Sequence, residues 1–334
     1  GKFMYPLQEA IRKGIIKNSI FVVNKLYLLV LFIGIAIVDG ALALFSLLVY
    51  FGIYIKNIFS ARLPIDPGGE FSYITKIYKT VEDTELKMDI WYPKEARDSY
   101  PLVLFAHGGG WISGFRNQPN NVSWCKYLAS KGFAVASIDY RFGIKNDMAD
   151  ILSDYDNALA FLRSNADKLS IDTKNIILMG LSAGGHLSLL YSSYYSYMED
   201  KGRMDGIQGV VAYYAPSDLE EMLSPETKSL FARYATVKTL KGRPDSQGEE
   251  YREYSPIYWV SKEMPPVLLV HGKEDKTVPF SSAIKLGKEL KEQGIPYELL
   301  VHPHGDHSFE LNSKDFQTIR ILNKTINWMR GRLT

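Results

Sequence analysis

Residues 175–188 read NIILMGLSAGGHLS, and this stretch decides the fold. An apolar run at 176–179 ends in Gly180, and a helical pattern begins after Ser182. Residues 180–184 fit G-x-S-x-G, in which a strained strand-to-helix turn lifts a serine hydroxyl out of a sheet. Glycine is expected on both sides because a side chain there would clash in so tight a turn. The stretch therefore predicts an exposed, reactive serine at position 182.

Short apolar runs alternate with helical stretches beyond residue 72. Residues 73–80 and 86–92 alternate like the two strands of a hairpin. The pattern predicts further strands at 102–106, 134–138, 176–179, 210–214, 267–270 and 298–301, and helices at 150–166, 281–293 and 315–330. This alternation is typical of an α/β fold, a mostly parallel sheet with helices on both faces. In such sheets, sites form beyond the carboxyl ends of the strands.

The composition is that of a globular protein, with 46% apolar and 23% charged residues among 334. The single cysteine, Cys125, excludes an internal disulfide and a C-x-x-C metal cluster. Residues 1–62 carry seven lysines and arginines against two acids, a net +5, so the remainder of this +2 chain carries −3. A mildly acidic main domain argues against nucleic acid as a partner. Nothing in the sequence fixes the oligomeric state.

A hydrophobic segment at residues 26–55 contains thirty residues and one charge, Asp39. About 20 apolar residues span a bilayer, so one tilted transmembrane or membrane-embedded helix fits. The alternatives are a buried helix of the main domain and a signal peptide. Residues 41–43 (ALA) resemble a cleavage site, but the apolar run continues for twelve residues beyond them, which favours a retained anchor. We expect an anchor at 1–62, a linker at 63–72 and a main domain at 73–334.

Membrane topology depends on how Asp39 is accommodated. A carboxylate at mid-membrane costs on the order of 3 kcal/mol, so Asp39-Gly40 could instead mark a hairpin or a contact with a polar partner. With a single span, five lysines and arginines before the segment and two after it place the N-terminus in the cytoplasm and the main domain outside. Residues 5–18 are expected to form a short helix on the membrane surface.

A serine hydroxyl needs a base, and the chain has six histidines. His307, in the loop after the last strand (VHPHGDHSFE), is the expected base, with His304 as the alternative; His186 is expected to pack or hydrogen-bond within the helix after Ser182. The base needs a carboxylate to orient it. Asp275, in VLLVHGKEDKTVP, is the expected partner, with Glu274 as its competitor. The order Ser182, Asp275, His307 is that of α/β-hydrolases.

Backbone amides are also required, because the oxyanion of an acyl-transfer intermediate needs N–H donors. The apolar strand at 102–106 runs into His107-Gly108-Gly109-Gly110-Trp111, where the chain can approach a substrate carbonyl closely. The amide of Ala183, which follows the serine, supplies a further donor. No cofactor or metal is expected, although His302, His304 and Asp306 could hold a cation.

Together these motifs resemble the hormone-sensitive-lipase-like branch of α/β-hydrolases, and most closely the group named for bifunctional acetylxylan/feruloyl esterases. The resemblance covers residues 74 to 328. Its markers are LKMDIWYP, HGGGWISG, GFAVASIDYR, IILMGLSAGGHLSLL, YSPIYWV, PPVLLVHGKEDKTVP and HPHGDHSF. It implies Ser182 as nucleophile, His307 as base and Asp275 as orienting acid. It assigns the oxyanion donors to Gly109, Gly110 and Ala183, and it makes Asp154 a structural aspartate.

The resemblance implies an acyl ester as substrate but does not identify it. Residues 217–255 correspond to the cap of this fold, and their apolar side chains either line an acyl pocket or pack on the sheet. The leading hypothesis is a membrane-anchored serine esterase acting on a small, lipid-like or cell-envelope acyl ester. An acyltransferase or an amidase could use the same triad. A non-catalytic membrane scaffold is the third possibility.

Overall fold

The computed structural model describes residues 20–334, with side chains from Lys25 onward. The chain divides into two compact units, one within the first 61 residues and one from Arg62 to Thr334. We call the first the N-terminal hairpin and the second the sheet unit. The surface helix predicted at residues 5–18 lies outside the described residues.

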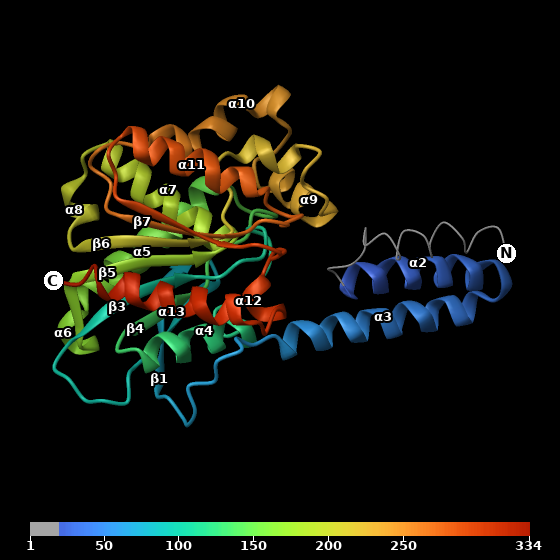
Figure 1. Cartoon of the computed structure of the whole chain (residues 1–334), viewed down its shortest axis with the longest axis horizontal. Helices are drawn as coiled ribbons and strands as arrows, with labels where there is room; N and C mark the ends of the chain where they lie inside the picture. The colour runs from blue at the N-terminus through green and yellow to red at the C-terminus, as the bar shows by residue number, and fades with distance from the viewer. Residues whose placement is uncertain (1–19) are drawn as a thin grey trace. The chain divides into compact units, whose positions relative to one another are not determined.

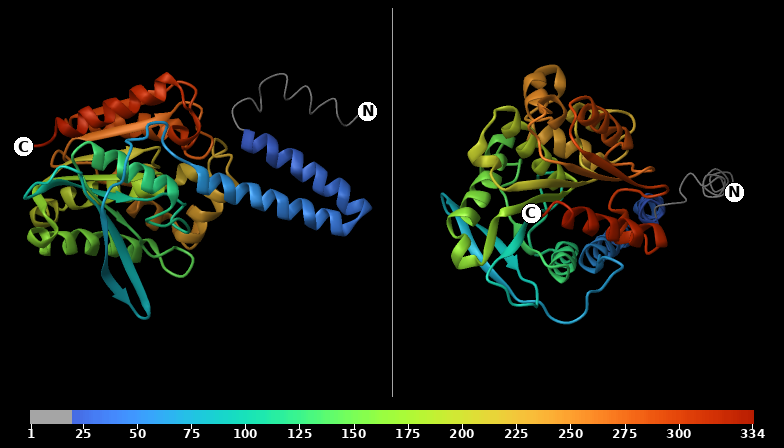
Figure 2. Two further views of the ribbon diagram at one scale, coloured as in Figure 1. Left: turned by 90° about the horizontal axis from the view of Figure 1, so that it is seen from below. Right: turned by 60° about the vertical axis from the view of Figure 1, so that its left-hand side comes forward.

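The N-terminal hairpin consists of α2 (Ile20–Val38) and α3 (Gly40–Ser60), which run antiparallel to one another (Figure 2). The expectation of one continuous helix through residues 26–55 is wrong. Asp39 breaks it: its backbone is extended, and its carboxylate accepts a 2.9 Å hydrogen bond from the amide of Ala41. Aspartate favours this N-cap position, so it starts a new helix instead of continuing the old one. Of the described helices, α3 alone is long and apolar enough to cross a membrane by length and composition.

The sheet unit contains one eight-stranded sheet in the order β1-β2-β4-β3-β5-β6-β7-β8 (Figure 1). β1 and β2 form an antiparallel hairpin, β2 pairs antiparallel with β4, and all other pairs are parallel. The predicted α/β class and mostly parallel sheet are therefore confirmed. The strands are β1 Tyr73–Val81, β2 Thr84–Trp91, β3 Tyr100–Ala106, β4 Ala134–Ile138, β5 Ile171–Leu181, β6 Ile207–Tyr213, β7 Val267–Gly272 and β8 Tyr297–His302.

Helices cover both faces of this sheet. The helices are α4 Pro119–Ser130, α5 Met148–Ser164, α6 Ala166–Leu169, α7 Ala183–Tyr197, α8 Lys201–Met204, α9 Leu230–Thr239, α10 Pro244–Glu253, α11 Phe280–Glu292, α12 Phe309–Asn312 and α13 Phe316–Arg330, with 3-10 turns η1 Leu219–Leu223 and η2 Pro256–Trp259. Side chains of β3 alternate between the two cores, as the two-residue period of a strand requires. Leu102 and Leu104 pack with α5, α7 and α11, whereas Val103 and Phe105 pack with α4 and α13.

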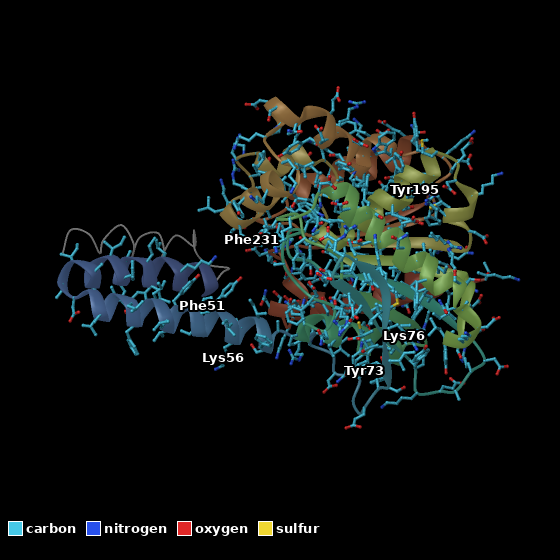
Figure 3. The ribbon with its side chains drawn as sticks, turned by 180° about the vertical axis from the view of Figure 1, so that it is seen from behind. Phe51, Lys56, Tyr73, Lys76, Tyr195 and Phe231 are labelled. Atoms are coloured by element: carbon cyan, nitrogen blue, oxygen red, sulfur yellow. The ribbon has the colours of Figure 1, made fainter. Side chains whose placement is uncertain are left out.

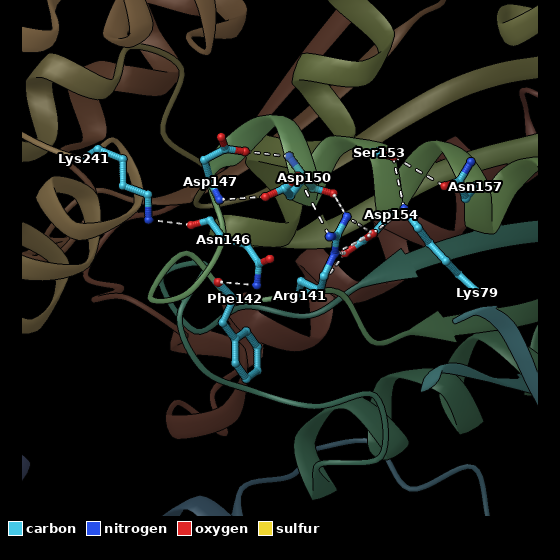
Figure 4. A network of polar contacts seen from close by, with 10 residues as sticks. All are labelled: Lys79, Arg141, Phe142, Asn146, Asp147, Asp150, Ser153, Asp154, Asn157 and Lys241. Carbon is cyan, nitrogen blue, oxygen red and sulfur yellow. Dashed lines mark hydrogen bonds and ion pairs between the residues drawn. The ribbon is translucent and has the colours of Figure 1, made fainter. Parts of the chain in front are cut away.

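Asp154 has the structural role that the family resemblance implied. This fully buried carboxylate on α5 accepts hydrogen bonds from the backbone and guanidinium of Arg141 and from Lys79 on β1 (Figure 4). A buried charge is tolerated only when it is paired and hydrogen-bonded in this way. The network fixes the loop after β4, and Lys241 beyond α9 holds the same loop by donating to the carbonyls of Gly143 and Asn146.

Candidate active site

Ser182 occupies the turn between β5 and α7 in a backbone conformation that side-chain-bearing residues rarely adopt, with φ 53° and ψ −113°. The flanking glycines are required there. A Cβ on Gly184 would lie 2.0 Å from the carbonyl oxygen of Ala106, and one on Gly180 would lie 2.1 Å from the backbone of Gly184. The expected reason for the two glycines is confirmed: the first turn of α7 presses against the end of β3.

Ser182, His307 and Asp275 meet beyond the carboxyl ends of β5, β8 and β7. His307 Nε2 lies 2.9 Å from Ser182 Oγ, and His307 Nδ1 lies 2.9 Å from Asp275 Oδ2. A carboxylate only accepts hydrogen bonds, so the imidazole proton sits on Nδ1 and Nε2 is left as an acceptor for the serine hydroxyl. The arrangement can therefore take a proton from Ser182 and spread the resulting charge over a buried ion pair.

Asp275 is held in its charged form by the groups around it. Its Oδ1 accepts hydrogen bonds from the amides of Thr277 and Val278, at 2.8 and 2.9 Å. His271 Nε2 lies 3.4 Å from Oδ2. Burial by itself disfavours the charged carboxylate, but the charge of His307 and the hydrogen bonds from both histidines hold the pKa of Asp275 well below its ordinary value.

His307 is packed against Tyr214, with ring centroids 4.5 Å apart. Burial disfavours the imidazolium, but the charge and hydrogen bond of Asp275 raise the pKa of His307 above its ordinary value of 6.5. A raised pKa in the folded state means that protonation of His307 stabilises the fold fully below pH 6.5. That contribution is lost as the pH rises through the raised pKa.

Tyr214 is itself held by a buried acid that sequence reasoning missed. Its hydroxyl donates to Oε1 of Glu310 on α12, and Trp124 Nε1 lies 3.4 Å from the same oxygen. Glu310 is fully buried, and burial raises its pKa above the ordinary value. The only feature of the sequence that could have pointed to Glu310 is its position three residues after His307.

The glycine loop after β3 lies directly beside the serine. A Cβ on Gly108 would be 3.4 Å from Ser182 Cβ, and Gly109 and Gly110 have φ values of 124° and 62°. The carbonyl of Gly109 is fixed by the amide of Ile112 and the hydroxyl of Ser113. Within residues 20–334, the amides of Gly109, Gly110 and Ala183 donate no hydrogen bond to the protein. These three N–H groups are free to bind a ligand.

His186 ties three parts of the site together and does not face the serine hydroxyl. Its Nδ1 accepts a 3.1 Å hydrogen bond from the indole of Trp111, and its Nε2–H donates to the carbonyl of Tyr254 at 2.7 Å. Burial lowers the pKa of His186 to about 4. An imidazole that burial keeps neutral near pH 7 thus links α7, the glycine loop and the end of α10. The packing role expected for His186 is confirmed, but its two partners had no signal in the sequence.

The alternative base and acid lie apart from the serine. The His304 side chain is 77% exposed and lies 3.4 Å from Glu274 Oε1, so these two residues face each other at the surface. His302 is buried against Asp315, with which its Nε2 makes a 2.9 Å contact. The possible cation set of His302, His304 and Asp306 is not assembled, since the described residues include no group of three or more His, Cys, Asp or Glu side chains arranged to hold a metal ion.

Helix α9 of the cap region lies over the glycine loop. A Cβ on Gly110 would be 2.8 Å from Ala235 Cβ and 3.2 Å from the ring of Phe231. Ala232 and Ala235 are buried on the inner face of α9, while Phe231 and Tyr234 remain about half exposed. The inner face of α9 therefore packs against the sheet unit, while apolar side chains on the same helix stay partly exposed. Of these, Phe231 lies beside the glycine loop.

A separate cavity of about 320 Å³ lies away from this site, between α5, α7 and the end of α10. Its lining includes Tyr191, Tyr194 and Tyr195 from α7, of which Tyr195 is labelled in Figure 3. None of the residues expected to be functional lines it.

Comparison with known proteins matches residues 88–290 to the BD-FAE family model. Esterase LipC of Mycobacterium tuberculosis is 29% identical over 239 residues, covering 69% of this chain and 58% of LipC. Isoprenylcysteine alpha-carbonyl methylesterase ICME of Arabidopsis thaliana is 23% identical over 235 residues, covering 66% of this chain and 53% of ICME. The chain thus spans little more than half the length of these relatives.

Two solved structures share the fold. The apo form of Thermogutta terrifontis esterase 2 is 25% identical with a TM-score of 0.62, covering 82% of this chain and 99% of that one. A truncated carbohydrate esterase from gut microbiota is 22% identical with a TM-score of 0.64, covering 81% and 99%. These likenesses confirm the α/β-hydrolase fold.

The first prediction concerns the ion pair. Asp275→Asn removes the charge that opposes desolvation, so the pKa of His307, followed by NMR of its imidazole protons, should fall below the native value. Glu274→Gln is the matched control, because it removes the neighbouring carboxylate that faces His304. An equal fall of the His307 pKa in both variants, or no fall in Asp275→Asn, would contradict the assignment of Asp275 as the partner of His307.

Proposed function

Because this chain belongs to the BD-FAE family of α/β-hydrolases, we propose that it is a serine carboxylesterase that cleaves small acyl esters. The single observation that carries the proposal is the continuous hydrogen-bond path from Asp275 through His307 to Ser182. The curated relatives bear the names esterase and methylesterase, which supports ester chemistry. The free amides beside the serine support an acyl-transfer reaction.

In the proposed mechanism, Ser182 Oγ attacks the ester carbonyl carbon while its proton passes to His307 Nε2. Asp275 stays ionised and stabilises the imidazolium. The carbonyl oxygen becomes an oxyanion and accepts hydrogen bonds from the amides of Gly109, Gly110 and Ala183. The alcohol leaves with the proton from His307, which forms the acyl-enzyme. Water then gives a proton to His307 and attacks the acyl carbon, and collapse of this second intermediate returns the proton to Ser182.

The strained turn supports the nucleophilic role of Ser182. A non-glycine residue with positive φ is costly and persists only where the surrounding structure enforces it. Here the backbone packs so closely around Gly180 and Gly184 that a Cβ atom at either position would clash with neighbouring backbone atoms. The turn holds the hydroxyl within reach of His307 before substrate arrives, so little reorganisation is needed during reaction.

We further propose that the N-terminal hairpin binds a lipid bilayer and keeps the esterase near amphiphilic substrates. Residues 26–55 contain one charge in thirty residues, and many of their leucine, isoleucine and phenylalanine side chains are exposed. Exposed apolar surface of this extent indicates contact with an apolar partner. Substrates with a lipid-like acyl chain follow from this location.

The second prediction concerns turnover. Ser182→Ala should lower kcat for p-nitrophenyl butyrate by on the order of 10⁶-fold, because removal of the nucleophile disables the whole triad. The control is His304→Ala, which removes the exposed alternative histidine and should leave kcat within a factor of two or so of the native value. Both variants are compared by initial rates and by circular dichroism. Loss of activity in His304→Ala, or full activity in folded Ser182→Ala, would overturn the assigned roles.

The third prediction concerns the acyl pocket. Phe231→Ala should raise KM for p-nitrophenyl hexanoate by roughly fivefold, the effect of about 1 kcal/mol of lost apolar contact. The change should be smaller for the acetate ester, which is too short to reach the ring. Leu230→Ala is the matched control on the same helix, since Leu230 is 82% exposed. Equal KM values for hexanoate in the two variants would show that Phe231 does not line the pocket.

A further inference from the structure

The N-terminal hairpin carries its charges at its two ends. Lys25 lies near the start of α2 and Lys56 near the end of α3, so the antiparallel arrangement places both at the open end of the hairpin, where the chain enters and leaves. Asp39, the only other charged residue between them, lies at the closed tip. The side chains of Phe51 and Lys56 project from α3 in Figure 3. The hairpin is therefore apolar along its length and charged at both ends.

The apolar part of the hairpin is somewhat shorter than a bilayer. At about 1.5 Å per residue, α2 extends about 21 Å from Lys25 to Val38 and α3 about 26 Å from Gly40 to Lys56, against about 30 Å of hydrocarbon. A stretch of this length crosses where the bilayer thins locally and the flanking lysines snorkel. Lys25 and Lys56 can extend their ammonium groups to the nearer interface along their own stems. Tyr27 and Tyr54 each lie two residues from these lysines, and tyrosine is enriched at membrane–water interfaces.

Asp39 is suited to a membrane–water interface and not to the bilayer centre. Its carboxylate caps α3 through the amide of Ala41 and is exposed. The buried residues of α3 are small: Ala43 is 4% exposed and Ser46 is 9% exposed, with the Ser46 hydroxyl donating to the carbonyl of Leu42. Small residues allow helices to pack closely in lipid. Two packed helices satisfy their backbone hydrogen bonds internally, as segments within a bilayer must.

We propose that α2 and α3 cross the bilayer as a hairpin, with Asp39 at the far interface and with the start of α2, the end of α3 and the sheet unit on one side. This inference rests on the proposed membrane binding and fixes its topology. It places Lys25, Lys56 and Arg62 on one side and no lysine or arginine at the tip, and in the sequence all seven lysines and arginines of residues 1–62 lie outside residues 26–55. Cytoplasmic flanks carry the excess of basic residues, so that side is the cytoplasm.

The consequence is a reversal of the expected sidedness. The placement of the main domain outside the cell assumed one continuous span, and the break at Asp39 removes that assumption. The esterase site then works at the cytoplasmic leaflet. Its substrates are amphiphilic acyl esters that are made in or reach that leaflet, and not esters of the outer envelope.

The test uses single-cysteine labelling in the full chain. Cys125 is fully buried, and burial raises the pKa of its thiol, so the native chain supplies an unreactive background. Val38→Cys reports the tip, Ser60→Cys the open end, and Asp83→Cys the sheet unit at the β1–β2 turn. Leu48→Cys, in the middle of α3, is the matched control for a lipid-buried position. Each is exposed to a membrane-impermeant maleimide in intact spheroplasts and again after lysis.

The expected result is labelling of Val38→Cys in intact spheroplasts, labelling of Ser60→Cys and Asp83→Cys only after lysis, and no labelling of Leu48→Cys before detergent. Labelling of Asp83→Cys in intact spheroplasts would overturn the cytoplasmic placement. Protection of Val38→Cys until detergent is added would overturn the full crossing. Release of the native protein from membranes by a carbonate wash would instead contradict the proposal that the hairpin is embedded in the bilayer. Esterase activity of the washed protein reports separately on the proposed catalytic function.

Discussion

The close contact between the end of β3 and the first turn of α7 is the constraint on which the rest of the site depends. Gly184 lies against the carbonyl of Ala106, and only a hydrogen atom fits between them. This contact forces Ser182 into its strained turn and brings Gly108 to its side. A nucleophile and the amides that would receive its oxyanion are thus positioned by one piece of backbone packing.

The ion pair between Asp275 and His307 orients the base toward the serine. Asp275 is buried, yet two backbone amides and two histidines keep it charged, and that charge in turn raises the pKa of His307. A buried ion pair is a poor source of net stability, because desolvation offsets the attraction. Its value here is geometric: it fixes the tautomer of His307 and leaves Nε2 facing Ser182.

The sheet and the meeting of three distant residues could be predicted because each rests on a local pattern. Apolar runs marked the strands, and Ser182, Asp275 and His307 each followed one of them. Contacts made across the fold carried no such pattern, so the link from Trp111 through His186 to Tyr254 and the Glu310–Tyr214 support went unforeseen. The hairpin was raised only as an alternative, because apolar composition alone does not distinguish one long helix from two. The cap that the Asp39 carboxylate makes on α3 is the feature that separates the two helices.

The most direct measurement is to map the site of covalent modification by a fluorophosphonate, at a series of pH values, in the native chain. The roles assigned to the triad predict that the phosphonyl group is found on the peptide that contains Ser182. They also predict that the inactivation rate falls as the pH drops through a midpoint above 6.5, the ordinary pKa of histidine, because protonated His307 cannot accept the serine proton. Modification of a different residue, or a chain that hydrolyses esters and is never modified, would contradict them.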